Sequence, residues 1–316
     1  MTAARPPRDP WAVPETPLLA RYAHDRLADR RADPAYLERA WHDEDARVLT
    51  VSPSGTVAVT GSAERPDLVW ARPEQVAAVE GIRVFLGEAA GRPYFAQLAS
   101  GPVDDQDWRT LREVGAALTD LEVGLLTSAV ALRAWHLGHP RCPRCGAATE
   151  VAQAGWTRVC PVDGSEHFPR TDPAVIMLVH DGAGRCVLAR GPQWQPGRMS
   201  VLAGFVEAGE SAEAAVAREV SEEVGIRIRD IAYAGSQPHP FPASLMLGFS
   251  ARLDGDPTLC LDQDEIAEAG WFTRDEVRAT ADWGSAEVAA GGRLQALPST
   301  MSIARQLINT WLAAED

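Results

Sequence analysis

The sequence predicts a mixed α/β (α+β) protein with two domains and a small metal-binding knuckle between them. Short β-like runs separated by Gly and Pro occupy the first half of the chain. A segment rich in Cys, Pro and Gly follows, and the remainder alternates apolar strands with helical patterns. At 316 residues and 46% hydrophobic content, the chain is long enough to bury about two cores.

Residues 1–17 form a predicted mobile arm, because prolines at 6, 7, 10, 14 and 17 disfavour both helix and sheet. Residues 18–137 form the predicted N-terminal α/β domain. One or two helices are expected over residues 108–136. The β-rich part of this domain is predicted from short runs at residues 47–52, 56–60, 68–72, 82–86 and 93–98.

Residues 138–169 form the predicted knuckle, which has too few apolar residues to fold without a covalent or metal cross-link. Three of the five cysteines, Cys142, Cys145 and Cys160, lie in it. This clustering favours a metal site in a reducing compartment over a disulfide framework, so we expect a cytoplasmic protein. Cys186 and Cys260 lie in apolar strand-like runs and are expected to be core residues.

Residues 170–316 form the predicted second domain. Its longest apolar run, at residues 174–179, is far shorter than the roughly 20 residues of a membrane helix, so no membrane association is expected. The expected elements are a strand at 174–180, a helix at 211–224, strands near Ile231 and at 245–253, and a helix at 302–314.

The formal charge of −14 argues against a general nucleic-acid surface, because such a surface requires a basic face. The chain contains no lysine, so Arg supplies every fixed cation of its side chains. An anionic ligand must therefore be held locally, and Arg is suited to bidentate contacts with a diphosphate.

The helix expected at 211–224 can be capped by Ser211 and ended by Gly225. Val216, Val220 and Val224 recur every four residues and predict a buried stripe. This stripe fixes which side of the helix faces the core.

Glu219, Glu222 and Glu223 share a neighbouring sector of the same helix. Like charges at this spacing repel one another, so a cation is the natural remedy, and hard oxygen ligands select Mg²⁺ or Mn²⁺. The alternative is a solvated acidic face. The preceding Gly204 favours the metal site, because it lets the backbone approach and offer a carbonyl, expected to be that of Ala203. Glu210 and Arg218 are expected to orient the carboxylates.

Two segments carry a family resemblance. Residues 204–226 match G-x5-E-x7-R-E-U-x-E-E-x-G-U (U aliphatic) at every fixed position, which is the Nudix box. Residues 236–244 read SQPHPFPAS and resemble the SQPWPFPxS array of NADH pyrophosphatases. Taken without the resemblance, this proline-rich string predicts a rigid loop between strands. The chain thus resembles zinc-ribbon NADH pyrophosphatases of the Nudix superfamily, which implies an α/β/α sandwich after the knuckle.

The resemblance also implies the site residues. The metal ligands would be Glu219, Glu223 and Glu265 with the Ala203 carbonyl, and Glu223 or Glu265 would accept a proton. Phe168 and Phe205 would stack on bases, and Arg112 would contact phosphate. The residues implied to line the dinucleotide are Gln237, Pro238, His239, Pro240, Phe241, Pro242, Ala243, Ser244 and Ala304.

The sequence departs from this pattern at three substrate positions. His239 stands where the family has Trp, and it offers less stacking area. Gly155 stands where a ligand-contacting Glu is typical, and Phe168 replaces Tyr. These changes bear on base preference more than on the reaction.

The knuckle departs as well, because the second Cys pair of the family reads Cys160-Pro-Val-Asp163 here. One structural zinc held by Cys142, Cys145, Cys160 and Asp163 is the favoured interpretation, with His139 and His167 as further candidate ligands. A metal-free relic is the alternative. A redox role is disfavoured, because the CxxC lacks a βαβ context.

The implied reaction is metal-dependent hydrolysis of the diphosphate in NADH or NAD⁺, which gives the (reduced) mononucleotide and AMP. Rival interpretations are ADP-ribose hydrolysis, removal of an NAD cap from the 5′ end of RNA, and a non-catalytic nucleotide sensor. The intact Glu cluster argues against the sensor. The resemblance further implies a homodimer.

Overall fold

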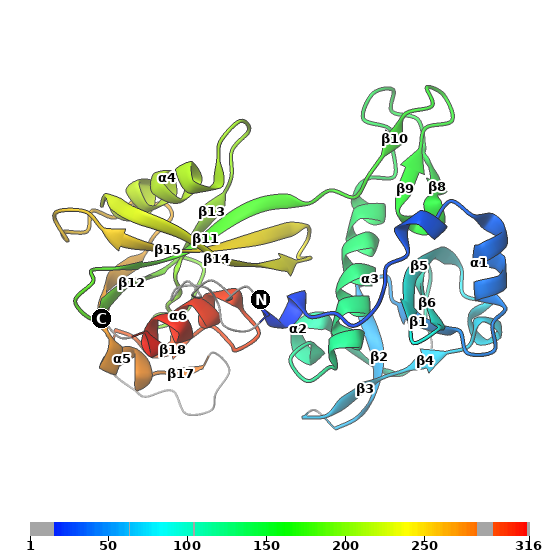
Figure 1. The fold of residues 1–316 in the computed structure, drawn as a ribbon, viewed down its shortest axis with the longest axis horizontal. Coiled ribbons are helices and arrows are strands. Elements are labelled where there is room, and N and C mark those ends of the chain that lie inside the picture. Colours follow the sequence, from blue (N-terminus) through cyan, green and yellow to red (C-terminus); the bar gives the residue numbers. More distant parts are fainter. Residues whose placement is uncertain (1–15, 63, 104, 283–292, 315–316) are drawn as a thin grey trace, which may run out of the picture. The chain divides into compact units, whose positions relative to one another are not determined.

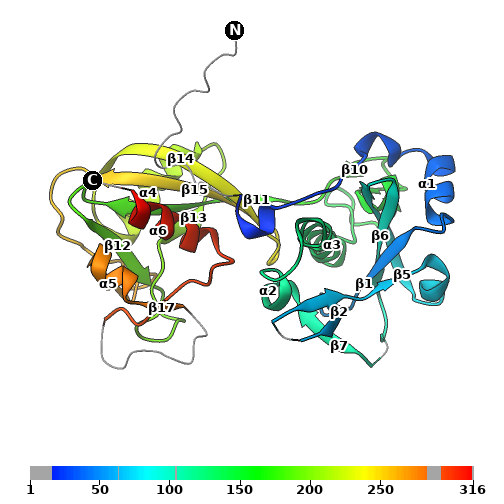
Figure 2. The same ribbon diagram turned by 60° about the horizontal axis from the view of Figure 1, so that its bottom comes forward.

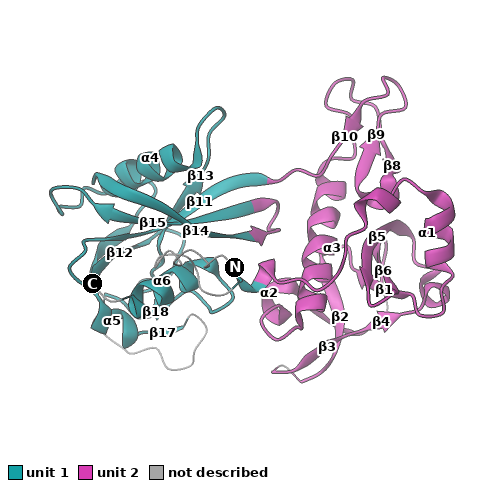
Figure 3. Ribbon diagram, viewed as in Figure 1, with its two compact units in different colours: residues 1–18, 172–237, 245–316 teal, residues 19–171, 238–244 magenta. Residues whose placement is uncertain are grey.

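The computed structural model describes residues 16–62, 64–103, 105–282 and 293–314, so most of the predicted arm lies outside the described residues. The chain forms two compact units (Figure 3). Unit 1 contains residues 1–18, 172–237 and 245–316, and unit 2 contains residues 19–171 and 238–244. Within the described residues, no helix has both the length and the apolar character needed to cross a membrane.

Unit 2 is built on a seven-stranded sheet in which the main path runs β3-β2-β1-β6-β5. Strand β4 pairs with β1, and β7 pairs with β2. The pairing of β1 with β6 is parallel, whereas β5 and β6 are antiparallel. The strands are β1 (Arg47–Val51), β2 (Thr56–Gly61), β3 (Pro66–Leu68), β4 (Trp70–Ala71), β5 (Gly81–Ala89), β6 (Arg92–Ala99) and β7 (Asp107–Thr110).

The helices of unit 2 begin at sequence-encoded caps. The Asp33 side chain accepts from the Tyr36 backbone N–H, and Thr110 and Thr119 each form a capping box. Helix α3 contacts β1, β5 and β6 and appears end-on beside the sheet in Figure 2. The helices are α1 (Pro34–Trp41), α2 (Leu111–Val114) and α3 (Asp120–Gly138), with 3-10 turns η1 (Leu18–Ala20, which crosses from unit 1), η2 (Ala28–Arg30) and η3 (Pro73–Val76).

The knuckle closes unit 2 with a small three-stranded sheet in the order β10-β9-β8. The elements are β8 (Glu150–Ala152), η4 (Gln153–Gly155), β9 (Thr157–Val159) and β10 (Glu166–His167).

Unit 1 contains a six-stranded sheet with the main path β14-β15-β11-β12-β16, and β13 pairs with β11. A short parallel pair, β17 and β18, lies outside it. The strands are β11 (Asp172–His180), β12 (Arg185–Arg190), β13 (Leu202–Phe205), β14 (Ile228–His239), β15 (Ser244–Leu253), β16 (Glu268–Thr273), β17 (Ala281–Asp282) and β18 (Ala296–Leu297).

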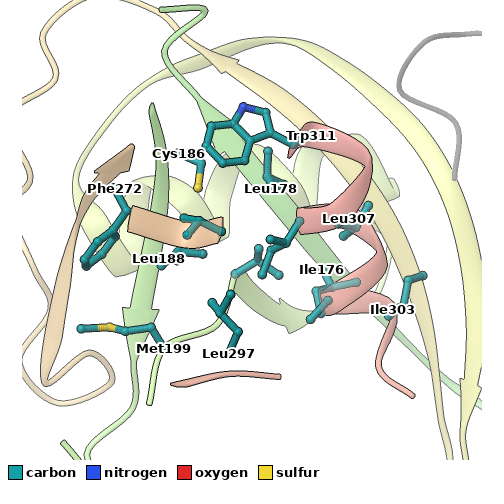
Figure 4. Packing of buried hydrophobic residues seen from close by; sticks show 14 of the residues in the cluster. Ile176, Leu178, Cys186, Leu188, Met199, Phe272, Leu297, Ile303, Leu307 and Trp311 are labelled. Atoms are coloured by element: carbon teal, nitrogen blue, oxygen red, sulfur yellow. The ribbon is translucent and has the colours of Figure 1, made fainter. Parts of the chain in front are cut away.

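Helices cover both faces of this sheet: α4 (Ala212–Val224) lies on one face and α6 (Ile303–Ala313) on the other (Figure 1). Helix α5 (Arg274–Arg278) follows β16. Alternate residues of β11 serve the two cores, because successive strand side chains point to opposite faces. Ile176 and Leu178 pack with α6 (Figure 4), whereas Val175 and Met177 pack with α4. Unit 1 is therefore the predicted α/β/α sandwich.

The structure corrects three expectations. Trp108 begins no helix, because residues 107–110 form β7 and the helix starts only after the Thr110 cap. Helix α1, which the sequence analysis did not predict, starts where Asp33 and Pro34 supply a cap and a first-turn proline. Cys186 is buried in β12 as expected, but Cys260 is exposed, because it follows β15 in an irregular connection.

Candidate active site

The catalytic candidates of unit 1 are positioned by helix α4. The Ser211 side chain accepts from the Ala214 backbone N–H at 3.2 Å, and Gly225 ends the helix with φ 71°. Val216, Val220 and Val224 are fully buried, as the stripe predicts. Full burial of a Val side chain contributes about 1.5–3 kcal/mol, so this face locks the rotation of the helix.

Strand β13 brings the backbone against the carboxylate face of α4. A Cβ atom built on Gly204 would lie 1.9 Å from Cδ of Glu219, so any larger residue would displace this carboxylate from its place in the cluster. The Ala203 backbone, which pairs with Ile176 of β11, immediately precedes this contact. The predicted approach of a backbone segment to the Glu cluster is thus present.

Three carboxylates gather at this point. Ligand atoms of Glu219, Glu223 and Glu265 all lie within 4.8 Å of one another. Glu219 and Glu223 are 8% and 7% exposed, whereas Glu265 is exposed. One oxygen of Glu223, Oε2, is buried without a hydrogen-bond partner among the described residues. A buried orphan oxygen among like charges is the arrangement that a divalent cation would satisfy.

The electrostatics match this geometry. Burial, with added repulsion from Glu219 and then Glu265, raises the pKa of Glu223 to about 8. Burial also raises the pKa of Glu219, although the Arg218 guanidinium opposes this. Ionisation of Glu223 is therefore disfavoured near neutral pH in the absence of a cation.

Arg218 holds the outer side of the cluster. It donates two hydrogen bonds of 2.9 Å to the carboxylate of Glu210, one of 2.8 Å to Glu219 and one of 2.9 Å to Glu222. A further bond of 2.9 Å reaches the Phe205 carbonyl oxygen. The paired guanidinium lowers the pKa of Glu210 to about 2. Arg218 thus ties the loop before α4 to the carboxylate face, as expected for an orienting residue.

Glu222 is placed differently from its two neighbours in sequence. Its side chain is 56% exposed and pairs with Arg218, and it is not part of the group formed by Glu219, Glu223 and Glu265. The structure brings Glu219, Glu223 and Glu265 together and leaves Glu222 at the rim.

The residues predicted to line the dinucleotide fall into both units. In unit 1, Gln237 is buried and donates to the Met301 carbonyl oxygen at 3.0 Å, and its Oε1 has no partner among the described residues. Ala304 belongs to the buried face of α6, and Phe205 is 61% exposed. In unit 2, Phe168 is also 61% exposed. Pro238 and His239 end β14, the turn after it consists of Pro240, Phe241, Pro242 and Ala243, and Ser244 begins β15, so the loop is shorter than the predicted residues 236–244.

Arg112 lies in unit 2 with this loop. Its guanidinium is 3.2 Å from Nε2 of His239 and 3.9 Å from the ring centre of Phe241. The sequence predicts Arg112 and the SQPHPFPAS segment as separate substrate contacts, and the structure places Arg112 in contact with His239 and Phe241.

The local backbone and packing explain why glycine occupies position 155. It is buried with φ 90°, and a Cβ there would lie 2.6 Å from Cγ2 of Val84. Its carbonyl oxygen also accepts a hydrogen bond of 2.9 Å from His136. This position therefore offers no side chain to a ligand, and a Glu would require the local backbone to change.

The knuckle of unit 2 consists of two loops with the same backbone design. In one, the Cys142 N–H donates to the Ala147 carbonyl, and the Gly146 N–H donates to the Cys142 carbonyl. In the other, Cys160 N–H donates to Ser165 carbonyl and Gly164 N–H donates to Cys160 carbonyl. Asp163 therefore occupies the place in the second loop that Cys145 occupies in the first.

The four side chains have the spacing of a tetrahedral zinc site. Sγ of Cys145 and Cys160 are 3.5 Å apart, and Sγ of Cys142 is 3.5 Å from Oδ2 of Asp163. Zn–S of about 2.3 Å and Zn–O of about 2.0–2.2 Å give tetrahedral edges of roughly 3.8 Å between sulfurs and 3.5–3.7 Å between sulfur and oxygen. The residues fit the metal.

Ser165 is a site residue that the sequence analysis missed. Its backbone N–H and its hydroxyl both donate to Oδ1 of Asp163, at 2.9 and 2.5 Å. The other oxygen, Oδ2, thereby stays free to act as a ligand. The local sequence Asp163-Gly164-Ser165 is typical of an Asx-type turn and could have identified Ser165. The other candidates lie elsewhere: His139 contacts the Trp135 carbonyl, and His167 contacts Ser165.

Two family models match parts of the chain. The NUDIX domain matches residues 170–290, and the NADH pyrophosphatase zinc ribbon domain matches residues 139–168. The first range contains α4 and its carboxylates, and the second contains the knuckle.

Similar proteins span nearly the whole chain. It is 43% identical over 310 residues to the NAD-capped RNA hydrolase NudC of Mycobacterium bovis, covering 95% of this chain and 96% of the relative. The protein of the same name from Mycobacterium tuberculosis gives the same identity and coverage. A human NAD-capped RNA hydrolase is 38% identical over 206 residues, which is 62% of this chain and 43% of the human protein.

Proposed function

The chain belongs to the NADH pyrophosphatase family of Nudix hydrolases, and on this premise we propose that it hydrolyses the diphosphate bond of NADH and NAD⁺. The products are (reduced) nicotinamide mononucleotide and AMP. The observation that carries the proposal is the group formed by the buried Glu219 and Glu223 with the exposed Glu265, next to Gly204. Such a group has no use in a merely structural helix, because its mutual repulsion lowers stability.

Glu219, Glu223, Glu265 and the Ala203 carbonyl would hold Mg²⁺ or Mn²⁺, since all are hard oxygen ligands. A bound divalent ion would neutralise charge on the diphosphate and lower the pKa of the attacking water. The orphan Oε2 of Glu223 supports this assignment.

The protein side chains then divide the work. Glu223 or Glu265 accepts a proton from the attacking water while the oxygen of that water forms the new bond to phosphorus. The bridging P–O bond breaks, and its oxygen leaves with one of the two nucleotides. Arg218 keeps Glu219 and Glu210 oriented, and Arg112 contacts the phosphates. Phe168 and Phe205 present exposed rings for stacking on bases.

Removal of an NAD cap from RNA is a second candidate activity. It breaks the same diphosphate bond, and the relatives that span the chain carry that name. The charge of −14 supports entry of a 5′ end and not contact with a long RNA. ADP-ribose offers the same bond with one base fewer.

We assign a structural zinc to the knuckle, with Cys142, Cys145, Cys160 and Asp163 as its ligands. The support is the repeated loop design and the tetrahedral spacing.

The three cysteines of the knuckle form no disulfide, which favours a reducing compartment, the cytoplasm, as the location of the protein. The family resemblance supports a homodimer, which analytical ultracentrifugation measures.

The test is a kinetic comparison of NADH, NAD⁺, ADP-ribose and NAD-capped RNA with the same concentration of Mg²⁺ or Mn²⁺. We expect AMP together with the corresponding mononucleotide from NADH, as chromatography of the products measures. Binding of all four without cleavage under either metal would instead support the sensor. A rate on capped RNA well above that on NADH would make cap removal the main activity.

A further inference from the structure

Three side chains of unit 2 form a connected group that we call the Arg112 clamp: Arg112 of α2, His239 at the end of β14 and Phe241 in the turn after it. Arg112 lies over the face of Phe241 and reaches Nε2 of His239 at 3.2 Å. The rings of His239 and Phe241 meet edge to face, with centroids 5.0 Å apart. Each member thus contacts both others.

The hydrogen bond fixes the form of the His239 ring. A guanidinium has only N–H donors, so Nε2 of His239 must accept, and the ring proton must be on Nδ1. Burial and the adjacent Arg112 charge lower the pKa of His239 to about 4, which keeps the ring neutral near pH 7. His239 is therefore an acceptor for Arg112 under ordinary conditions.

The contact with His239 leaves several N–H groups of the Arg112 guanidinium unused. It forms no ion pair with a carboxylate among the described residues, whereas Arg109, three residues earlier, is paired with Asp107 at 2.6 Å. A guanidinium has five N–H donors, and the contact with His239 uses one of its nitrogens. The remaining edge suits the oxygens of a phosphate.

The same contacts occupy the rings. One face of Phe241 is covered by the guanidinium, and His239 turns its acceptor nitrogen to Arg112. An indole in place of His239 could only donate through its ring nitrogen, so it could not accept from Arg112. The histidine therefore supplies a function that a larger aromatic ring lacks.

We propose that His239 is a positioning residue for Arg112, and that the clamp makes this loop recognise the charge of the diphosphate instead of stacking on a base. The inference rests on the proposed function, because it needs a diphosphate substrate. Its consequence concerns substrate class: the loop should bind dinucleotide diphosphates alike, whatever group stands at the nicotinamide end.

The experiment measures KM and kcat for NADH, NAD⁺ and ADP-ribose, which share the ADP-ribose portion and differ at that end. His239→Ala should raise KM roughly three- to tenfold for all three, the scale of one lost hydrogen bond. Arg112→Ala should raise KM about tenfold or more. kcat should change less than KM in both, because Glu219 and Glu223 remain.

Two further variants separate positioning from a general structural effect. His239→Gln keeps an acceptor near the position of Nε2, so its KM should return to within about threefold of wild type. His239→Ala added to Arg112→Ala should change KM less than twofold, because the clamp is already broken. Arg109→Ala is the matched control, since it removes a nearby exposed Arg and should leave KM unchanged.

Two outcomes would overturn the inference: a KM increase limited to one of the three substrates, or full multiplication of the two single effects in the double variant. The first would mean that His239 contacts the base. If the wild type cleaves none of the substrates, the proposed function fails, and the clamp is then tested by calorimetric binding of ADP-ribose. Equal affinity of wild type and His239→Ala in that titration would reject the clamp on its own.

Discussion

Glu223 combines deep burial with two close carboxylates, so its substitution should separate catalysis from stability. Glu223→Gln keeps the volume and one carbonyl oxygen but removes the charge. We expect kcat for NADH to fall about 10²- to 10⁴-fold, the scale of lost acid–base assistance. Steady-state kinetics with Mg²⁺ measures it. A variant that keeps more than about a tenth of kcat would contradict the role of this residue.

The same variant should change how the stability of the metal-free protein depends on pH. The pKa of Glu223 is about 8 in the fold, above the ordinary 4.5, so folding favours the protonated form. This contribution is complete below pH 4.5 and is lost as pH rises through 8. Urea unfolding at pH 5 and pH 8.5 should show a smaller drop for Glu223→Gln than for wild type. Glu213→Gln, exposed in the first turn of α4, is the control.

Residues fixed by local spacing could be predicted, and those joined by tertiary contact could not. Glu219 and Glu223 are four apart on one helix, so their shared face follows from the sequence. Glu265 reaches them from an irregular segment, and only the family resemblance indicated it. Nothing in the sequence indicated that His239 would contact Arg112 across 127 positions. The substitution of Trp by His suggested only lost stacking, whereas the structure shows a gained acceptor.

At the scale of the element, the stability of α4 depends on the several hydrogen bonds that the Arg218 guanidinium donates. Lys has one terminal nitrogen and cannot reproduce the paired bonds to Glu210 while also serving Glu219. Arg218→Lys should lower the free energy of unfolding by about 1–3 kcal/mol, the usual scale for charged hydrogen bonds that are partly shielded. Urea denaturation measures this loss.

Arg185→Lys is the matched control in unit 1. Its pair with Asp181 is 2.7 Å long, but the Arg side chain is 45% exposed, so the loss should stay below about 1 kcal/mol. Equal losses in the two variants would show that Arg218 is an ordinary surface cation.

The knuckle makes a second prediction at this scale. Protein purified without added zinc should hold about one equivalent, and Asp163→Ala should hold less and lose it sooner to a chelator. Asp163→Cys should hold it more tightly, since a fourth thiolate replaces the carboxylate in the same loop design. Ser165→Ala should fall between wild type and Asp163→Ala, because Oδ1 loses the hydroxyl donor.

Elemental analysis and the visible spectrum of the cobalt-substituted protein measure these differences. Co²⁺ should report three sulfur ligands in wild type and four in Asp163→Cys. Identical spectra in wild type and Asp163→Ala would remove Asp163 from the ligand set. Less than about a tenth of an equivalent in wild type would support the metal-free relic.

Elements with strong end signals were the predictable ones. Helix α4 follows from Ser211, Gly225 and the Val stripe, all of which the structure confirms. Strands β13 and β16 were not predicted, because short runs interrupted by Gly and Trp carry no clear alternation. Pairing with β11 and β12, respectively, supplies what their own sequence lacks.

At the scale of the whole molecule, the two candidate metal sites belong to different units. The zinc candidates are all in unit 2, and the carboxylate group is in unit 1. Removal of zinc with a chelator that spares Mg²⁺ should speed hydrogen exchange in the segment from β8 to β10 and leave α4 protected. Added Mn²⁺ should slow exchange in α4 and β13, because ligand binding stabilises the part that it contacts.

Mass spectrometry of deuterium uptake resolves the two units. The Asp163→Ala variant is the internal control, since chelator should affect its knuckle least. A uniform change over both units after zinc removal would mean that the chain opens as one cooperative body.

Gly204 leaves no space for even one additional carbon beside the carboxylate of Glu219. We therefore expect that active variants carry no substitution at position 204, whereas neighbouring positions vary. In a library that randomises residues 203, 204 and 206 and is sorted for hydrolysis, position 204 should return glycine alone. Position 203 should accept many residues, since its proposed contribution is a backbone carbonyl that every amino acid carries. One position is thus restricted by its shape and its neighbour is open, although both serve the same cation.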